Sequence, residues 1–216
     1  AKYILKPGGT LGDLYTNSDL VYNDDGYIEV DKNGNVAVKD DYMDDIYLGS
    51  VFPKYNLAWR NDFNYKGINL GVLFTARIGG ICYSATQANM DLYGVSEASA
   101  AARDAGGVMI NGRDMIDAQK WYQVIGSQSG LPQYYTYSAT NVRLQELSLG
   151  YTLPSKWFRD KMRMTVSFVG RNLWMIYCKA PFDPEAVAST GMNYQGIDYF
   201  MMPSMRNLGF NVKFQF

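Results

Sequence analysis

Hydrophobic and polar residues alternate strictly along the C-terminal stretch Arg206–Phe216. One side of this stretch carries amides, a glycine and a lysine, and the other side carries only large apolar residues: Leu208, Phe210, Val212, Phe214 and Phe216. A period of two predicts a β-strand with two unlike faces. In a soluble sandwich the polar face of such a strand meets water. In an outer-membrane barrel the apolar face meets lipid and the polar face meets the lumen.

The same alternation recurs along the chain and predicts five long strands, at about 55–65, 68–80, 142–153, 161–174 and 204–216. Their lengths match the roughly 9–11 residues of a tilted membrane-spanning strand better than the roughly 5–6 residues of a globular strand. In the third strand the pattern predicts that Leu147, Leu149 and Tyr151 share a face with Arg143 and Gln145. The segment Gly170–Trp174 is expected to leave the fourth strand.

The connections between these strands fall into two classes. Lys66-Gly67 and residues 154–161 are short, whereas the segments before Asn56, at 81–141 and at 175–203 are long. Antiparallel neighbours would place all short turns at one end and all long loops at the other, which is typical of an outer-membrane barrel. The predicted fold class is therefore all-β, with antiparallel up-and-down strands forming part of a transmembrane outer-membrane β-barrel. Long extracellular loops and one short loop helix, at 96–104, complete it.

Two regions are expected: an extracellular acidic loop region with small hairpins at 1–54, and the barrel strands at 55–216. Asp25-Gly26 and Asn33-Gly34 are dipeptides that supply the positive φ angles of tight turns. A solvated surface is the favoured interpretation of the acidic residues. The alternative is calcium binding, because Asp31, Asn33 and Asn35 are spaced like the first ligands of an EF-hand, although its glycine and its final glutamate are not in place.

Composition narrows the function classes. The net charge of −1 gives no nucleic-acid footprint, and no apolar run is long enough for a membrane-spanning helix, which leaves a barrel open. The 216 residues include no His and two Cys, Cys82 and Cys178, whose pairing stays open. No cofactor and no metal is expected. The chain's first residues lack the order of a signal peptide, so a signal was removed or the chain begins within a longer protein.

Charged residues on the polar faces of the strands are candidates for the barrel lumen: Arg60, Asp62, Arg77, Arg163 and Lys213. They would pair with a plug or line the path of a solute, and plug pairing is the favoured use. Three clustered tyrosines, Tyr134, Tyr135 and Tyr137, are candidates for stacking on sugar rings. The alternative, that they pack a loop onto its scaffold, is the commoner role of such residues.

Parts of the sequence would also fit a glycosidase or a soluble carbohydrate-binding domain. Glu146 with Asp183 or Glu185 provides the carboxylates of a glycosidase, but nothing in the sequence fixes their separation and Asp183-Pro184 is typical of a turn. The chain is therefore not expected to be an enzyme. The main alternative to a barrel is a soluble β-sandwich that binds carbohydrate through the tyrosine cluster.

Several motifs in order resemble one family over about residues 20–216. They are Tyr47–Lys54, Leu144–Pro154, Val169–Trp174, Phe182–Glu185 and the terminal aromatic residue. Together they resemble the C-terminal part of a SusC/RagA-type TonB-linked outer-membrane transporter of Bacteroidetes. The resemblance implies import of glycans or peptides across the bacterial outer membrane through a plugged barrel, capped by a SusD-like lipoprotein and powered by TonB. Phe214 and Phe216 resemble the signal read by the barrel-assembly machinery.

The number of strands departs from this family. Its barrels have roughly 22 strands, together with an N-terminal plug and a TonB-contacting segment, and five strands cannot close a barrel. The chain is therefore expected to be a fragment that does not transport alone. Its expected partners are the remainder of the barrel and plug and the outer-membrane lipid.

Overall fold

The computed structural model describes residues 1–40, 45–159, 161–189, 191 and 194–215. The chain forms two compact units that interleave along the sequence. The loop unit comprises residues 1–52, 80–138 and 187–201, and the sheet unit comprises residues 53–79, 139–186 and 202–216. These bounds differ from the expected division at residue 54, because the long segments between strands fold with the N-terminal region.

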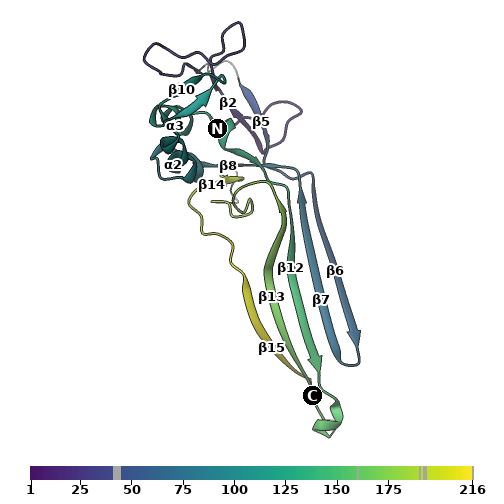
Figure 1. Cartoon of the computed structure of the whole chain (residues 1–216). Helices are drawn as coiled ribbons and strands as arrows, with labels where there is room; N and C mark the ends of the chain where they lie inside the picture. Colours follow the sequence, from purple (N-terminus) through teal and green to yellow (C-terminus); the bar gives the residue numbers. More distant parts are fainter. Residues whose placement is uncertain (41–44, 160, 190, 192–193, 216) are drawn as a thin grey trace. The chain divides into compact units, whose positions relative to one another are not determined.

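The sheet unit is a single five-stranded antiparallel sheet (Figure 1). Its strands are β6 (Tyr55–Tyr65), β7 (Ile68–Ile78), β12 (Asn141–Thr152), β13 (Arg163–Cys178) and β15 (Asn207–Gln215). They lie in the order β15-β13-β12-β7-β6, so each strand pairs with the next long strand of the chain. The five strands and the up-and-down order that the alternation predicted are confirmed.

Two short connections close one end of this sheet. Lys66 and Gly67, with φ angles of 47° and 86°, turn β6 into β7, and the 3-10 turn η2 (Ser155–Phe158) joins β12 to β13. Gly67 suits this turn because a glycine adopts positive φ without steric cost. The segments that leave the opposite ends of these strands are the ones that build the loop unit.

Irregularities in β12 and β13 correct two predictions. Leu144 pairs with Phe74 and Glu146 with Leu73, so Gln145 is an extra residue in β12 and forms a β-bulge. The bulge places Arg143 on the face opposite Leu147, not on the same face as predicted. The fourth strand, predicted at about 161–174 with Gly170–Trp174 leaving it, includes that segment and continues to Cys178.

A second irregularity lies in β13, where Arg171 pairs with Glu146 and Trp174 with Leu144. Between them Asn172 adopts a left-handed conformation with φ of 52°. Asparagine tolerates this conformation better than most residues because its short amide bonds locally. The strand therefore continues through the segment where the sequence suggested that it ends.

The loop unit contains short strands that form small sheets. These strands are β1 (Lys2–Tyr3), β2 (Asp13–Thr16), β3 (Ser18–Leu20), β4 (Val38–Asp40), β5 (Ile46–Ser50), β8 (Ile81–Ser84), β9 (Val108–Ile110), β10 (Asp114–Ile116), β11 (Thr136–Ser138) and β14 (Ile197–Asp198). They pair as β1-β2-β5, β3-β4, β9-β10 and β11-β8-β14. The turns predicted at Asp25-Gly26 and Asn33-Gly34 are present, because bridges join Tyr22 to Ile28 and Val30 to Val36 around them.

Three α-helices and a 3-10 turn lie in the loop unit: α1 (Ala85–Leu92), α2 (Glu97–Asp104), α3 (Ala118–Gly126) and η1 (Pro132–Tyr135). The predicted helix at 96–104 is α2, while α1 and α3 were not predicted. Each α-helix begins at a side chain that accepts a hydrogen bond from the first turn, namely Ser84, Ser96 and Asp117. Among the described residues, no helix has the length and hydropathy required to cross a bilayer.

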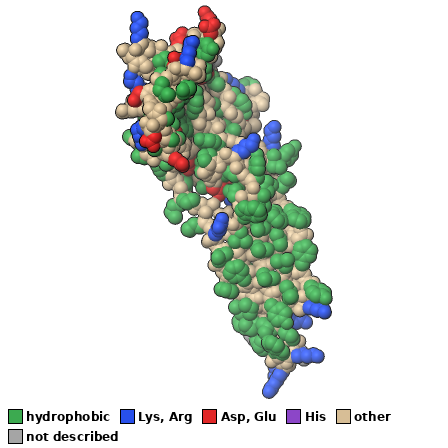
Figure 2. All heavy atoms as spheres, viewed as in Figure 1, with side chains coloured by type: hydrophobic (Ala, Val, Ile, Leu, Met, Phe, Trp, Pro, Cys, Tyr) green, Lys and Arg blue, Asp and Glu red, His purple; other side chains and the backbone are tan. Residues whose placement is uncertain are grey.

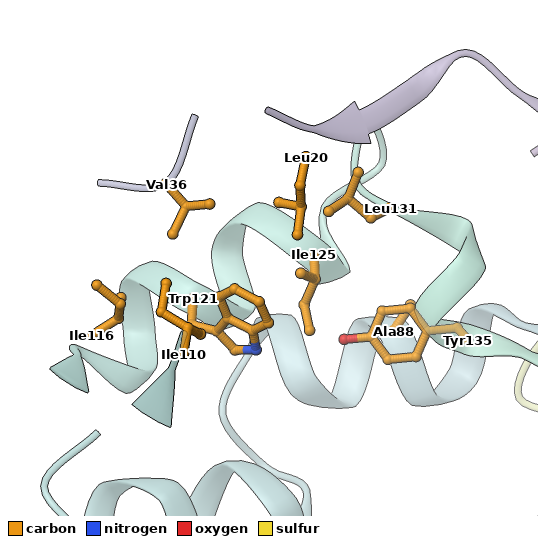
Figure 3. Packing of buried hydrophobic residues seen from close by; sticks show 9 residues of the cluster. All are labelled: Leu20, Val36, Ala88, Ile110, Ile116, Trp121, Ile125, Leu131 and Tyr135. Atoms are coloured by element: carbon orange, nitrogen blue, oxygen red, sulfur yellow. The ribbon is translucent and has the colours of Figure 1, made fainter. Parts of the chain in front are cut away.

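These helices bury a compact hydrophobic core (Figure 3). Its members are Leu20, Val36, Ala88, Ile110, Ile116, Trp121, Ile125, Leu131 and Tyr135. They come from the N-terminal hairpins, from α1 and α3, from the strands β9 and β10, and from the segment after α3. The long connection at 81–141 is thus an ordered part of the loop unit with its own core, which a structureless loop would lack.

Candidate functional site

The strand register places all five predicted lumen residues on one face of the sheet, the polar face. Asp62 pairs with Gly71, Gly71 with Ser148, Ser148 with Val169 and Val169 with Gly209. Directly paired residues share a face, and so do residues two apart in an unbulged strand. The face of this row therefore also carries Arg60, Arg77, Arg163 and Lys213.

Four charged side chains form a ladder across the polar face. Arg60 donates to Asp62 from Nε at 2.9 Å, and its guanidinium also lies 3.5 Å from Glu146. Arg171 donates to the other oxygen of Glu146 at 2.9 Å. The alternating signs pair each charge with an opposite one, so the polar face is suited to a wet or protein-filled lumen.

Gly71 leaves room for this ladder. A Cβ atom at this position would lie 2.5 Å from Ser148 Oγ and 2.9 Å from Asp62 Oδ1. Both contacts are too close, so a side chain here would displace the polar groups that face it. The glycine therefore fits the dense polar packing of this face.

The other face of the sheet, the apolar face, is covered with large hydrophobic side chains that remain exposed. Trp59 pairs with Phe74, Phe63 with Leu70, and Phe168 with Phe210. Trp59 is 62% exposed and Phe210 is 81% exposed. Figure 2 shows hydrophobic side chains over much of the visible side of the sheet. Burying such an area in a soluble protein would require a second layer, whereas in a bilayer it meets hydrocarbon.

One polar residue interrupts the apolar face. Asn61 pairs with Val72, which pairs with Leu147, so its side chain belongs to the hydrophobic rows. Its Nδ2 is buried and has no hydrogen-bond partner in the described part of the chain. The alternation of β6 gave no sign of a function for this residue.

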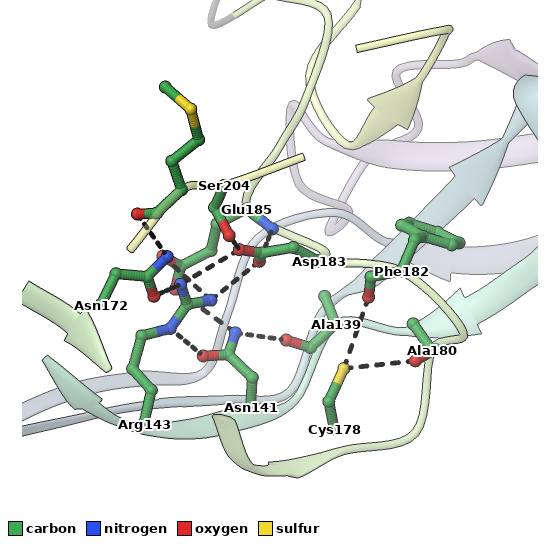
Figure 4. A network of polar contacts seen from close by, with 11 residues as sticks. Ala139, Asn141, Arg143, Asn172, Cys178, Ala180, Phe182, Asp183, Glu185 and Ser204 are labelled. Carbon is green, nitrogen blue, oxygen red and sulfur yellow. Dashed lines mark hydrogen bonds and ion pairs between the residues drawn. The ribbon is translucent and has the colours of Figure 1, made fainter. Parts of the chain in front are cut away.

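A buried network, the loop anchor, joins the long-loop end of β12 to two later segments (Figure 4). Arg143 donates to Asp183 from Nη2 at 2.8 Å and from Nη1 at 3.2 Å, a two-pronged pair. The two side chains are 4% and 8% exposed. Arg143 Nε donates to Asn141, and Asn141 Nδ2 donates to Glu185 at 3.3 Å. The loop after β13 is therefore fixed to the first residues of β12.

The loop anchor extends to the segment that leads into β15. Ser204 donates to Asp183 Oδ2, and Asn172 Nδ2 donates to the carbonyl of Met205 at 3.3 Å. Asn172 is the left-handed residue of the β13 bulge, so the irregular strand supplies part of the network. The motif Phe182–Glu185 thus has a structural role that sequence reasoning did not assign.

Hydrogen bonds and charge pairing within the loop anchor keep Asp183 ionised. Burial alone raises the pKa of Asp183, but hydrogen bonds from Arg143, Ser204 and the Glu185 amide outweigh it and hold the pKa below its usual value. The carboxylates weighed for a glycosidase are all engaged in ion pairs: Glu146 with Arg60 and Arg171, and both Asp183 and Glu185 with Arg143. The arrangement suits anchoring, not proton transfer.

The structure separates the three clustered tyrosines. Tyr135 is 2% exposed and donates to Asp91 Oδ2 at 2.9 Å, so it belongs to the core and not to a ligand surface. Tyr134 is partly exposed and packs edge-on against Trp121. Tyr137 lies in β11 opposite Cys82, and burial raises its pKa. Tyr135 therefore packs the loop onto its scaffold, which is the alternative to stacking on sugar rings.

Asp31 caps a turn at the calcium-like spacing. Its Oδ1 accepts hydrogen bonds from the amides of Asn33 and Asn35, both at 2.8 Å, and its Oδ2 accepts from the Asn35 side chain. These bonds hold the pKa of Asp31 below its usual value. The described residues contain no group of three or more His, Cys, Asp or Glu side chains that could hold a metal ion. The observed contacts match a surface turn.

An open cavity of about 840 Å³ lies in the loop unit. Its lining contains four tyrosines, Tyr83, Tyr93, Tyr194 and Tyr199, and the amides of Asn89 and Gln128. Among the described residues of the lining no side chain carries a charge, and Ala1 contributes the amino group of the chain. Sequence reasoning missed this cavity because its residues come from four separate segments of the chain. Only the high tyrosine content of the chain pointed to such a surface.

Comparison with known proteins gave one curated relative and several solved structures. No family model matches the chain. The chain is 25% identical over 198 residues to TonB-dependent receptor P3 of Formosa agariphila. This match covers 87% of this chain and 19% of the relative. The chain therefore spans about a fifth of the length of this relative.

The solved structures show the same fold. The RagAB peptide importer in its closed-closed state matches 99% of this chain and 24% of its own, with a TM-score of 0.57 and 19% identity. The importer in its open-open state matches 94% of this chain and 21% of its own, with a TM-score of 0.56 and 17% identity. In sequence and in fold the chain is similar to a segment of a SusC/RagA-like TonB-dependent transporter, which confirms the resemblance that its motifs indicated.

Proposed function

We propose that this chain is a segment of the barrel wall of a TonB-dependent importer in the bacterial outer membrane. The observation that carries the proposal is the exposed apolar face of a sheet whose opposite face holds a ladder of paired charges. A soluble protein would bury that face, and a barrel wall places it in lipid.

In this proposal the apolar face contacts hydrocarbon and the polar face contacts the lumen. Arg60, Asp62, Arg77, Arg163 and Lys213 then face a plug or the path of the solute. Because Arg60 and Asp62 already pair with each other, the exposed Arg163 and Lys213 are the better candidates for contact with a plug. The short turns of the sheet would then face the periplasm, and the opposite ends of its strands would face the outside of the cell.

The partners of the chain follow from the same proposal. Both edge strands, β6 and β15, would pair with the remainder of the barrel, since an unpaired edge leaves backbone groups unsatisfied in lipid. A SusD-like lipoprotein would cover the extracellular side, and TonB would act through a part of the protein outside this chain. Phe214, together with Phe216, which lies outside the described residues, would form the signal for the barrel-assembly machinery.

The solute is a glycan or a peptide, and the cavity of the loop unit favours a glycan. Its lining of tyrosines and amides, without charged side chains, suits a neutral ligand that stacks on aromatic rings and exchanges hydrogen bonds. The solved neighbours are described as peptide importers, so both solute classes belong in the proposal.

Heat modifiability tests the barrel proposal. The complete protein is extracted from outer membranes in detergent, and its gel mobility is compared with and without boiling. A barrel resists the detergent until it is boiled, so the two samples are expected to migrate differently. The alternative, a soluble carbohydrate-binding sandwich, predicts a protein that needs no detergent and shows no shift, and that result would refute the proposal.

A further inference from the structure

The end of the sheet that carries the short turns is strongly basic. It comprises residues 64–69, 150–167 and 211–215, which contain six of the 20 Lys and Arg residues of the chain. All six are exposed: Lys66, Lys156, Arg159, Lys161, Arg163 and Lys213. The sequence of these segments contains a single acid, Asp160, which lies outside the described residues. Arg163 and Lys213 belong to the polar face, so we name the other four cations, Lys66, Lys156, Arg159 and Lys161, the basic rim.

Backbone pairing keeps the basic rim together. The Thr152 amide donates to the Gly67 carbonyl at 2.7 Å, so the turn of β6 and β7 lies beside the start of η2. Lys66 and the cations of η2 and of the residues after it therefore lie at the same end of the sheet.

Aromatic residues of the apolar face border the basic rim. Tyr65 and Tyr151 lie in the last hydrophobic row beside Ile68, and Trp157 of η2 is 71% exposed. The Nζ of Lys66 lies 5.3 Å from the centre of the Tyr65 ring, so this lysine extends along the apolar face. Figure 2 shows Lys and Arg side chains gathered next to hydrophobic ones at this end of the sheet.

This combination matches the chemistry of a membrane interface. Tyrosine and tryptophan rings prefer the level of the lipid headgroups, and Lys and Arg extend apolar stems while keeping their charge in water. The lipid phosphates lie at this level. Four cations with one nearby acid leave a surplus of positive charge that neutral headgroups do not balance.

We propose that the basic rim binds the headgroups of anionic phospholipids in the leaflet that the short turns reach. This inference rests on the proposed function, because it requires the sheet to cross the membrane. The hydrophobic rows end directly at the cations, so a lipid whose tails contact those rows places its phosphate within their reach. A soluble polyanion would not use the adjoining apolar rows.

Lipid retention measured by native mass spectrometry tests the inference. The complete protein in detergent is offered equal amounts of phosphatidylglycerol and phosphatidylcholine, and the bound lipids are counted. The test variant carries Lys156→Gln, Arg159→Gln and Lys161→Gln. The control variant loses three exposed cations elsewhere in the chain, through Lys32→Gln, Lys179→Gln and Arg206→Gln.

The unaltered protein and the control are expected to retain phosphatidylglycerol in preference. The test variant is expected to lose this preference by about fivefold for each cation that contacts a headgroup. Lys66→Gln alone provides a second test if the first variant does not fold. An unchanged preference in a variant that keeps its heat-dependent gel shift would overturn the inference alone. Absence of the shift in the unaltered protein would overturn it together with the proposed function.

Discussion

Val72→Arg places a charge in the middle of the apolar face. Val72 pairs with Asn61 on one side and with Leu147 on the other. It lies five residues beyond Gly67, which corresponds to about 17 Å along the strand. With a strand tilt of about 40°, this is about 13 Å along the membrane normal, half of an apolar band roughly 25 Å tall. The substitution therefore places the arginine near the midplane of the bilayer.

At that depth an arginine on the lipid face costs about 2–4 kcal/mol, which is a large part of the stability of a typical domain. The assay is folding of the complete protein into liposomes, followed by the heat-dependent gel shift across a urea series. The folded fraction of Val72→Arg is expected to fall, and its unfolding midpoint is expected to move to lower urea.

Ser148→Arg is the matched control. Ser148 pairs with Gly71, so it lies at nearly the same depth but on the polar face. Its arginine would enter the lumen, and its folded yield is expected to remain close to that of the unaltered protein. If Val72→Arg folds as well as the unaltered protein while Ser148→Arg does not, the assignment of the two faces is reversed.

Three further predictions concern individual contacts. Asp183→Ala removes the two-pronged partner of the buried Arg143 and leaves it only Glu185 at 3.3 Å, so the loop anchor is expected to lose up to about 3–5 kcal/mol, and proteolysis of the loop after β13 reports the loss. Because its folded pKa is lowered, Asp183 stabilises the protein above its unfolded pKa, and this contribution is lost as pH falls below about 4, where hydrogen exchange of residues 179–186 would increase. Trp121→Ala is expected to cost the loop unit about 3–5 kcal/mol by opening a cavity in its core, measured by thermal unfolding, and an unchanged midpoint would contradict that core.

The strands of the sheet were predictable because alternation is a local property of the sequence. In β7 and β15 every second residue faces one side without interruption, and the predicted lumen residues on these strands share a face in the structure. The turn at Lys66-Gly67 was predictable for the same reason, since glycine at that position marks the reversal of the chain.

The bulges were not predictable from this pattern. Gln145 adds one residue to β12 and reverses the faces of the residues before it, which moved Arg143 from the expected face into the loop anchor. Asn172 allows β13 to continue through a left-handed residue where the alternation appeared to end. Pairing with neighbouring strands decides where both bulges form, and the sequence of one strand does not specify how its neighbours pair with it.

The organisation of the loop unit also depends on distant contacts. Helices α1 and α3 are short, and their hydrophobic residues become a core only when the N-terminal hairpins supply Leu20 and Val36. Tyr135 appeared in the sequence as one of three similar tyrosines. Its burial against Asp91 distinguishes it from Tyr134, and no local signal predicted that difference.

The central claim is that the apolar face of the sheet contacts lipid and the polar face does not. Spin labels placed one at a time at positions 147–152 of β12, with Cys82 and Cys178 replaced by serine, test it in the complete protein in liposomes. Labels at Leu147, Leu149 and Tyr151 are expected to be accessible to oxygen dissolved in lipid, and labels at Ser148, Gly150 and Thr152 to a water-soluble nickel reagent. Uniform accessibility to the nickel reagent at all six positions, or the opposite alternation, would contradict the claim.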